Sequence, residues 1–369
     1  MKQLSIMIKP ASSLCNMRCK YCFYADVSSL RSVDSFGIMA QDTTDRVLGH
    51  IFSDLAPGDR LILAFQGGEP TLAGLDYFRH VSEVAAPHRA RGVQVQYAIQ
   101  TNGLLLDEEW CQFLHEQNYL VGLSLDGPAL YHDANRLDAQ QKGTFQRVMA
   151  VKRRMDRQHV EYNVLMVLTN QMARHPQQIW RFIEEQNLRY VQFTPCMGPL
   201  EGEGGQYALT PRRYAGFYQT LFDLWYQRYR QGRYISIKLF DDLVNLLAYG
   251  ACNACGLLGQ CQAQIIVEAD GSVYPCDFYV LDHFRAGSLL EDSLRTVYES
   301  PVMQAFTRRP KEALPLCADC PYRRICGGGC ARMRREVFYA PEDTECGHRL
   351  FLDACIGRIQ QLAYEIRRR

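Results

Sequence analysis

The chain has 369 residues, 47 % of them hydrophobic and 22 % charged, which is typical of a globular protein with two or three domains. Its 41 basic and 40 acidic residues nearly cancel, so nucleic acid is not expected as a partner. No run of 18 apolar residues occurs, so no membrane span is expected. The 15 cysteines, an odd number, favour metal ligation over a disulfide framework.

The first ten residues lack the pattern of a targeting segment, because Lys9 and Pro10 interrupt their apolar run and no small-residue cleavage site follows. This favours the cytoplasm, where thiols stay reduced and disulfides are rare. The cysteines are therefore expected to be available to iron or zinc.

Short β-rich runs alternate with helical periods over the first two hundred residues, which favours βα units and a parallel sheet. Helices are expected near residues 41–55, 75–85, 107–117, 144–157 and 175–186. Strands are expected at residues 4–8, 60–65, 93–100, 120–125, 160–168 and 188–193. Six strands are fewer than the eight of a closed barrel, so the predicted fold is an α/β, (β/α)6 partial TIM barrel, with a flat doubly wound sheet as the alternative.

The pattern changes after residues 197–211, a glycine- and proline-containing stretch that predicts a loop before a helix at residues 214–229. Further on, residues 265–276 contain two β-runs around Asp270-Gly271, a favoured hairpin turn. Strands are otherwise few and cysteines dense. We therefore predict a barrel domain at residues 1–235 and a C-terminal domain at residues 236–369, built on metal sites rather than on a large core.

Three cysteines, Cys15, Cys19 and Cys22, form a CxxxCxxC motif directly after the first expected strand, where βα barrels carry their active sites. Three thiolates at this spacing can hold a cubic [4Fe–4S] cluster and leave the fourth iron open to a small ligand. The alternative is a zinc knuckle that lacks a ligand, or three incidental cysteines, although structural zinc favours four donors in one place.

Polar segments follow the next three strands as well: QGGEP at residues 66–70, QTNG at 100–103 and SLDGP at 124–128. Each alone is an ordinary turn, but four polar strand ends on one rim indicate a binding site, and glycines let the backbone approach a ligand closely. Arg136 follows the fourth strand and is a candidate for bidentate pairing with a carboxylate. An exposed arginine at a helix start is the alternative.

The C-terminal part carries eight further cysteines that could form two sets of four: Cys255, Cys261, Cys276, Cys317, Cys320, Cys326, Cys330 and Cys346. A pair of zinc ribbons is the alternative for them. The four cysteines left over are expected to pack as small hydrophobic residues: Cys111, Cys196, Cys252 and Cys355.

The CxxxCxxC motif with an aromatic residue before its last cysteine resembles the signature of the radical S-adenosylmethionine (SAM) superfamily. The resemblance implies that the open iron binds SAM through its amino and carboxylate groups, and that one electron splits SAM into methionine and a 5′-deoxyadenosyl radical. The residues that this resemblance and the strand-end pattern place at the SAM site are Tyr21, Gly67, Gly68, Glu69, Ser124 and Arg136.

The C-terminal CxxCxxxxxCxxxC core resembles a SPASM domain, which implies two auxiliary [4Fe–4S] clusters and three clusters in all. By this resemblance one cluster is held by Cys255, Cys261, Cys276 and Cys330. The other is held by Cys317, Cys320, Cys326 and Cys346. Four cysteine ligands leave no open iron, so both clusters are expected to carry electrons rather than bind substrate.

Four segments together resemble the anaerobic sulfatase-maturating enzymes: IKPASS at residues 8–13, CFY at 22–24, FQGGEPTL at 65–72 and GSVYPCDFYVLD at 271–282. The resemblance implies that an active-site cysteine or serine of a sulfatase is oxidised to Cα-formylglycine. The partners it implies are a sulfatase polypeptide and an electron donor such as flavodoxin or ferredoxin.

This reaction needs a general base beside the substrate heteroatom. Asp277 is the predicted base, because it follows Cys276 in an expected hairpin strand, where one alternation can turn its side chain away from the cluster. A satisfied strand aspartate is the alternative. Tyr24 and Gln66 are predicted to line the peptide site.

Two other functions stay open. One is a SPASM-type maturase that installs thioether or carbon–carbon crosslinks in ribosomal peptides, which the lack of an extra N-terminal domain before the first strand disfavours. The other is a binding module organised by zinc. Incubation with SAM and reductant separates them, because only the enzymes release deoxyadenosine.

Overall fold

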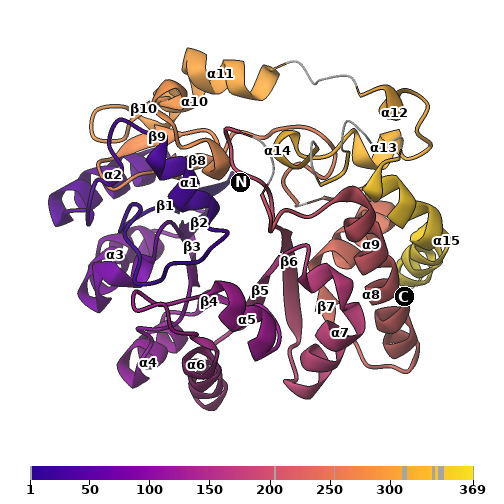
Figure 1. The fold of residues 1–369 in the computed structure, drawn as a ribbon. Coiled ribbons are helices and arrows are strands. Elements are labelled where there is room, and N and C mark those ends of the chain that lie inside the picture. Colours follow the sequence, from indigo (N-terminus) through magenta and orange to yellow (C-terminus); the bar gives the residue numbers. More distant parts are fainter. Residues whose placement is uncertain are drawn as a thin grey trace. The chain divides into compact units, whose positions relative to one another are not determined.

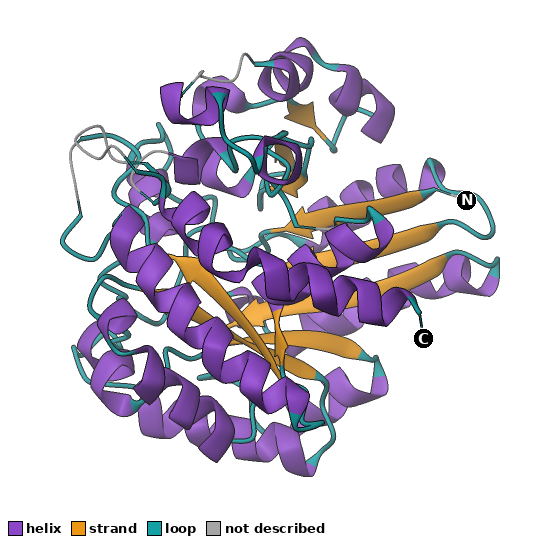
Figure 2. Cartoon of the chain, turned by 90° about the vertical axis from the view of Figure 1, so that its right-hand side faces the viewer, coloured by secondary structure: helices purple, strands orange, loops and turns teal. Residues whose placement is uncertain are grey.

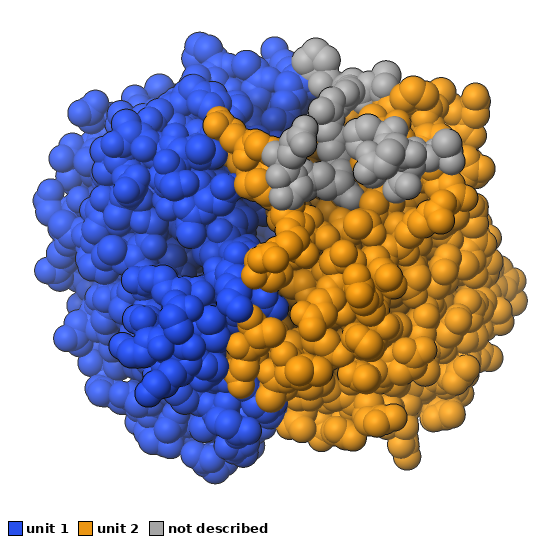
Figure 3. Space-filling view, in the orientation of Figure 1, with its two compact units in different colours: residues 1–124, 135–162, 263–309 blue, residues 125–134, 163–262, 310–369 orange. Residues whose placement is uncertain are grey.

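The computed structural model describes residues 2–202, 205–252, 254–309, 314–334, 337–339 and 345–368. Its internal contacts divide the chain into two compact units (Figure 3). Unit 1 comprises residues 1–124, 135–162 and 263–309, and unit 2 comprises residues 125–134, 163–262 and 310–369. Each unit takes residues from both sides of position 235, so the predicted domain boundary there stays a prediction.

Unit 1 is built on a sheet with the strand order β10-β9-β8-β1-β2-β3-β4. Four long strands run parallel: β1 (Gln3–Ile8), β2 (Arg60–Phe65), β3 (Gln94–Thr101) and β4 (Tyr119–Ser124). The strand β8 (Ile265–Val267) pairs with β1 in parallel and with β9 (Ser272–Tyr274) in antiparallel, and β10 (Gly287–Ser288) completes the order. The hairpin predicted around Asp270-Gly271 is therefore confirmed, with Gly271 in the left-handed region at φ +81°.

Helices follow these strands along the chain, and Figure 2 shows them as purple coils beside the orange strands. Helix α2 buries Val47, Leu48 and Ile51, whose spacing places them on one face. Unit 1 contains α1 (Phe23–Ser29), α2 (Gln41–Ser53), η1 (Pro70–Ala73), α3 (Leu75–Ala90), α4 (Glu108–Glu116), α6 (Phe145–Arg157), η3 (Asp277–Tyr279), η4 (Asp282–Phe284), α10 (Leu294–Glu299) and α11 (Pro301–Arg308).

Unit 2 has three parallel strands, β5 (Tyr162–Leu168), β6 (Tyr190–Pro195) and β7 (Ser236–Ile237). Its helices are α5 (Ala129–Asn135), η2 (Met172–Arg174), α7 (Pro176–Glu185), α8 (Pro211–Arg230), α9 (Lys238–Tyr249), α12 (Pro315–Ala318), α13 (Arg323–Cys326), α14 (Ala331–Arg334) and α15 (Gly347–Arg367). Figure 1 shows α15 beside α8 and α9, with which it packs.

A cluster of aromatic rings fills the space between these three helices. Phe222, Phe240 and Phe351 are fully buried, and the ring centroids of Phe222 and Phe240 lie 5.1 Å apart. The C-terminal part thus contributes Phe240 and Phe351 to an apolar core, in addition to the cysteines on which we predicted it to be built. A long C-terminal helix supplies the apolar surface, since its buried positions repeat at helical spacing.

The six predicted strands correspond to β1 to β6, with ends that differ by at most two residues. The α/β fold with a parallel sheet is confirmed. No helix among the described residues combines the length and the hydropathy that a membrane span requires.

Candidate functional site

The CxxxCxxC motif lies in the loop between β1 and α1. Cys22 is the N-cap of α1, and its backbone amide donates to the carbonyl of Cys19. Burial raises the pKa of Cys15 to about 11, the amide of Met17 opposes this shift, and nearby Glu69 and Cys22 add to it. The thiols of Cys15 and Cys22 therefore lie close to each other. Thiolates there need a cationic partner, which an iron cluster provides.

The glycine segment after β2 holds this loop in place. Gly68 donates its amide to the carbonyl of Ser12 at 2.7 Å, and Glu69 donates to the carbonyl of Leu14 at 2.7 Å. A Cβ on Gly68 would lie 2.0 Å from the oxygen of Leu14, so only glycine fits. Gly67 has φ +141°, which also favours glycine. The glycines therefore allow the loop just before Cys15 to pack closely.

Glu69 links the segment after β2 to the end of β3 through its carboxylate, which is almost fully buried. Its Oε1 accepts from the Thr71 hydroxyl and the Thr101 hydroxyl, both at 2.6 Å, and its Oε2 accepts from the amide of Asn102 at 2.7 Å. Burial raises the pKa of Glu69, and these donors oppose that shift. The Asn102 side chain also donates to Asn16 Oδ1 at 2.7 Å, inside the cysteine motif.

Arg136 lies beside the motif, since the backbone of residues 18–20 pairs with that of residues 135–137; its role at a SAM site stays a prediction. Its guanidinium carbon is 5.6 Å from the ring centroid of Tyr21, and the side chain is buried rather than exposed. Ser124 is buried at the end of β4. The structure thus brings Tyr21 and Arg136 together and leaves Ser124 at the adjoining strand end.

Asp277 is buried and both of its carboxylate oxygens are engaged. Lys9 Nζ lies 2.5 Å from Oδ1, and Gln66 Nε2 donates to Oδ2 at 2.8 Å. Asp277 does not lie on a hairpin strand as expected; it begins η3, because β9 ends at Tyr274. The next residue, Phe278, packs edge-on against Phe23 with centroids 5.1 Å apart, so Asp277 lies near the start of α1.

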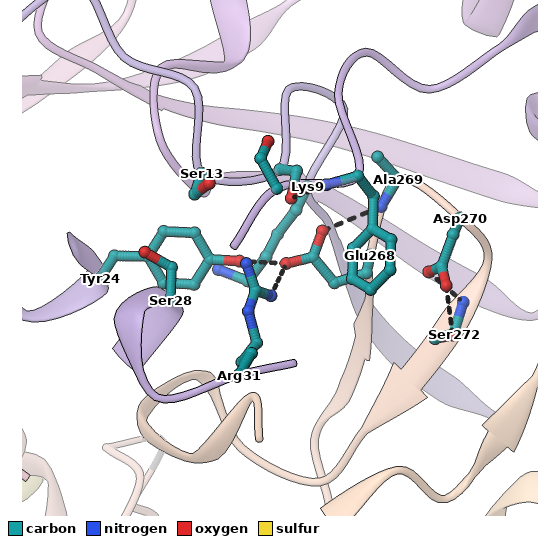
Figure 4. Close-up of polar contacts among 12 residues, drawn as sticks. Lys9, Ser13, Tyr24, Ser28, Arg31, Glu268, Ala269, Asp270 and Ser272 are labelled. Atoms are coloured by element: carbon teal, nitrogen blue, oxygen red, sulfur yellow. Dashed lines mark hydrogen bonds and ion pairs between the residues drawn. The ribbon is translucent and has the colours of Figure 1, made fainter. Parts of the chain in front are cut away.

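A second buried network stands next to this pair (Figure 4). The Tyr24 hydroxyl donates to Glu268 Oε1, and Arg31 Nη1 lies 2.7 Å from the same oxygen. The Lys9 ammonium sits 3.9 Å from the centre of the Tyr24 ring, which joins the two networks. Burial and Glu268 raise the pKa of Tyr24 well above its usual range. Tyr24 therefore presents its ring to Lys9 and its hydroxyl to Glu268.

Sequence reasoning did not identify Lys9, Arg31 or Glu268 as site residues. Lys9 and Glu268 are both fully buried, and a buried charged residue has to be paired. One feature of the sequence could have indicated Lys9: it is a lone lysine that interrupts an apolar run at the end of the first strand.

In unit 2, four cysteines surround one cavity: Cys317, Cys320, Cys326 and Cys346. Burial raises the pKa of Cys326 to about 11, the amide of Gly328 lowers it, and negative charge on the other three thiols raises it further. These effects require the four sulfurs to be near one another. The donor set is the one that a four-cysteine cluster needs.

Three of the other four cysteines also meet in unit 2. Burial raises the pKa of Cys255, and the neighbouring Cys330 and Cys261 raise it further. A Cβ on Gly256 would lie 2.7 Å from the Cβ of Cys330, so glycine permits the close approach. This supports the predicted grouping of Cys330 with Cys255 and Cys261 instead of with its sequence neighbours. Cys276, the fourth member, belongs to unit 1.

Two protein-family models match this chain, one over the CxxxCxxC motif and one over part of the C-terminal cysteines. Residues 10–183 match the radical SAM superfamily, and residues 255–321 match the SPASM iron-sulfur cluster-binding domain.

Several characterised proteins are similar over nearly the whole chain. The cysteine-type anaerobic sulfatase-maturating enzyme of Clostridium novyi is 39 % identical over 92 % of this chain and 90 % of its own length. The serine-type enzyme of Bacteroides thetaiotaomicron is 27 % identical over 90 % of this chain and 84 % of its own length. A solved structure of native anSMEcpe with bound AdoMet and the Cp18Cys peptide superposes with a TM-score of 0.90 at 36 % identity, covering 99 % of each chain. The chain therefore belongs to the family of anaerobic sulfatase-maturating enzymes.

Proposed function

We propose that this chain oxidises an active-site cysteine of a sulfatase polypeptide to Cα-formylglycine, in the cytoplasm and under anaerobic conditions. The observation that carries the proposal is the placement of the Asp277 carboxylate. It is held by Lys9 and Gln66 and lies next to the helix that begins at the last cysteine of the CxxxCxxC motif. A proton acceptor is thus fixed close to the place where a radical would be made.

The residues present fit the cofactors that the family requires. Cys15, Cys19 and Cys22 would hold the first [4Fe–4S] cluster, and the SAM site would be made by Tyr21, Gly67, Gly68, Glu69, Ser124 and Arg136. When bound, cluster and SAM supply a 5′-deoxyadenosyl radical that removes a hydrogen atom from Cβ of the substrate residue. The chain's own part is to fix the loop through Gly68 and Glu69 and to exclude water by burying Arg136 and Glu69.

Asp277 would then take the proton from the substrate thiol. The substrate loses a hydrogen atom from Cβ, a proton to Asp277 and one electron to an iron–sulfur acceptor, and a carbon–sulfur double bond forms. Water hydrolyses this thioaldehyde to the aldehyde and hydrogen sulfide. A serine substrate would lose the same hydrogen atom, proton and electron and give the aldehyde directly. Tyr24 and Gln66 would line the peptide site, with Gln66 also orienting Asp277.

The electron would leave through the auxiliary clusters. Their proposed ligands are Cys255, Cys261, Cys276 and Cys330 for one cluster, and Cys317, Cys320, Cys326 and Cys346 for the other. Support comes from the proximity of Cys255 to Cys330 and from the cavity that the second set surrounds. A flavodoxin or ferredoxin would supply the electron that starts each turnover.

A cysteine is proposed as the substrate rather than a serine because of the relatives. The relatives named cysteine-type are 39 % and 40 % identical to this chain, whereas those named serine-type are 27 % and 26 % identical. Anaerobic turnover of two motif peptides, one with cysteine and one with serine, tests this by mass spectrometry. An aldehyde from the cysteine peptide with 5′-deoxyadenosine is expected. A crosslinked peptide, or no deoxyadenosine, would reject the proposal.

A further inference from the structure

His348 lines the cavity that Cys317, Cys320, Cys326 and Cys346 surround. It lies in the first turn of α15, two positions after Cys346, which is the N-cap of that helix. Its side chain is almost fully buried, with 2 % of the residue exposed. The proposed function gives this histidine no role.

The two ring nitrogens of His348 have different surroundings. Nδ1 lies 3.0 Å from the hydroxyl of Tyr214, and within the described residues this is the one hydrogen bond that the hydroxyl makes. A buried phenol has to donate its proton, and Nδ1 is the acceptor within reach. A neutral imidazole carries one proton, so the hydrogen of His348 is assigned to Nε2.

Nε2 is buried and has no hydrogen-bond partner among the residues that the structure describes. The rings around the histidine offer it none, since Phe338 and Phe351 lie with centroids 5.1 Å and 6.1 Å from that of His348. A buried N–H group without an acceptor is costly and uncommon. His348 shares a cavity wall with four cysteines, and a cluster bound there would offer an acceptor, because cluster sulfurs accept hydrogen bonds.

We propose that Nε2–H of His348 donates a hydrogen bond to a sulfur of the auxiliary [4Fe–4S] cluster held by Cys317, Cys320, Cys326 and Cys346, and so raises the reduction potential of that cluster. The inference rests on the proposed ligand set. The reduced cluster carries one more negative charge than the oxidised cluster, so a donor stabilises the reduced form. His348 is thus a positioning and tuning residue that makes this cluster a better electron acceptor.

The same helix end contributes further donors. The backbone amides of His348 and Arg349 donate to the sulfur of Cys346 and lower its pKa, although burial raises that pKa by more. The Nε2–H group of His348 would be a further hydrogen-bond donor to the same cluster, directed at a different sulfur. Tyr214, which also lies near Cys326 and Cys346, would act by holding the imidazole in the required tautomer.

The test is a potentiometric titration of the full, reconstituted chain, followed by electron paramagnetic resonance. His348→Phe keeps an aromatic ring and removes the donor, so one midpoint potential should fall while the others stay. His348→Gln keeps an N–H group near the position of Nε2 and should restore most of that midpoint. Tyr214→Phe should shift the same midpoint downward by a smaller amount. His50→Phe, a matched change on helix α2 of the other unit, should shift none.

The iron content of the wild-type chain tests the ligand assignment, and the midpoint potentials of the variants test the role of His348. A wild-type chain that binds only two clusters would reject the ligand set. With three clusters bound, unchanged midpoints in both His348→Phe and Tyr214→Phe would overturn the role of His348. If His348→Phe fails to retain the cluster, a midpoint in Tyr214→Phe equal to that of the wild type would overturn the role of His348.

Discussion

Lys9 Nζ lies 2.5 Å from Asp277 Oδ1, and this ion pair joins the end of β1 to the segment that follows β9. The Lys9 side chain is fully buried and that of Asp277 is 11 % exposed. Lys9 and the Gln66 side chain together hold the carboxylate in one position, as a general base requires. The pair therefore joins two distant segments of unit 1 and fixes the position of Asp277.

Asp277→Asn should leave cleavage of SAM intact and reduce aldehyde formation by on the order of 10²-fold or more, because the amide cannot take up the thiol proton. Deoxyadenosine and aldehyde are measured in the same reaction with a cysteine motif peptide. An unchanged aldehyde yield would remove Asp277 from the mechanism. Asp282→Asn is the matched control on the neighbouring η4, and it should keep the wild-type yield of aldehyde.

Lys9→Met should destabilise unit 1 by about 3–5 kcal/mol, since it leaves the Asp277 carboxylate buried without a counter-charge. Thermal unfolding of the purified chain measures the change. The double variant with Asp277→Asn should be more stable than Lys9→Met alone, because the uncompensated charge is gone. Additive losses in the double variant would show that the two side chains do not interact.

Gly68→Ala should displace the loop that leads to Cys15, because the new methyl group would lie 2.0 Å from the carbonyl oxygen of Leu14. The chain should then lose about four irons and its ability to cleave SAM, while the auxiliary clusters remain. Gly49→Ala is the matched control, since nothing lies within 4 Å of the added group in helix α2. Full iron content in Gly68→Ala would contradict the close packing.

The two auxiliary ligand sets predict separate losses of iron. The wild-type chain should bind about twelve irons, and Cys330→Ala and Cys346→Ala should each lose about four. Their spectra should differ, because the two substitutions remove different clusters. Cys111 lies on the buried face of α4, and Cys111→Ala should leave the iron content unchanged. Zinc in place of iron, or identical spectra for the two variants, would contradict the assignment.

The secondary-structure elements were predicted best where the apolar residues follow a single periodicity, either of a strand or of a helix. Apolar residues of β2 and β5 alternate between buried and half-buried positions, and their bounds were found within two residues. Helix α3 runs five residues beyond its predicted end, because Pro87 is accommodated inside its last turn. The long helix α15 was not predicted, although Phe351, Leu352 and Cys355 repeat at helical spacing on its buried face.

The cluster cysteines could be proposed from their spacing, whereas the charges around Asp277 could not. Lys9 and Asp277 are 268 positions apart, and Arg31 and Glu268 are 237 apart, so no local pattern links them. The pairs exist because β8 inserts beside β1 in the sheet of unit 1. A pairing that depends on strand order in a sheet cannot be derived from periodicity alone.

Removal of a hydrogen atom from Cβ of the substrate cysteine is the step on which formation of the aldehyde depends. A motif peptide whose cysteine carries two deuterium atoms at Cβ, turned over anaerobically with SAM, tests this step. Deuterium is expected in the 5′-deoxyadenosine, and one deuterium should remain in the aldehyde product. Unlabelled deoxyadenosine formed together with aldehyde would contradict it.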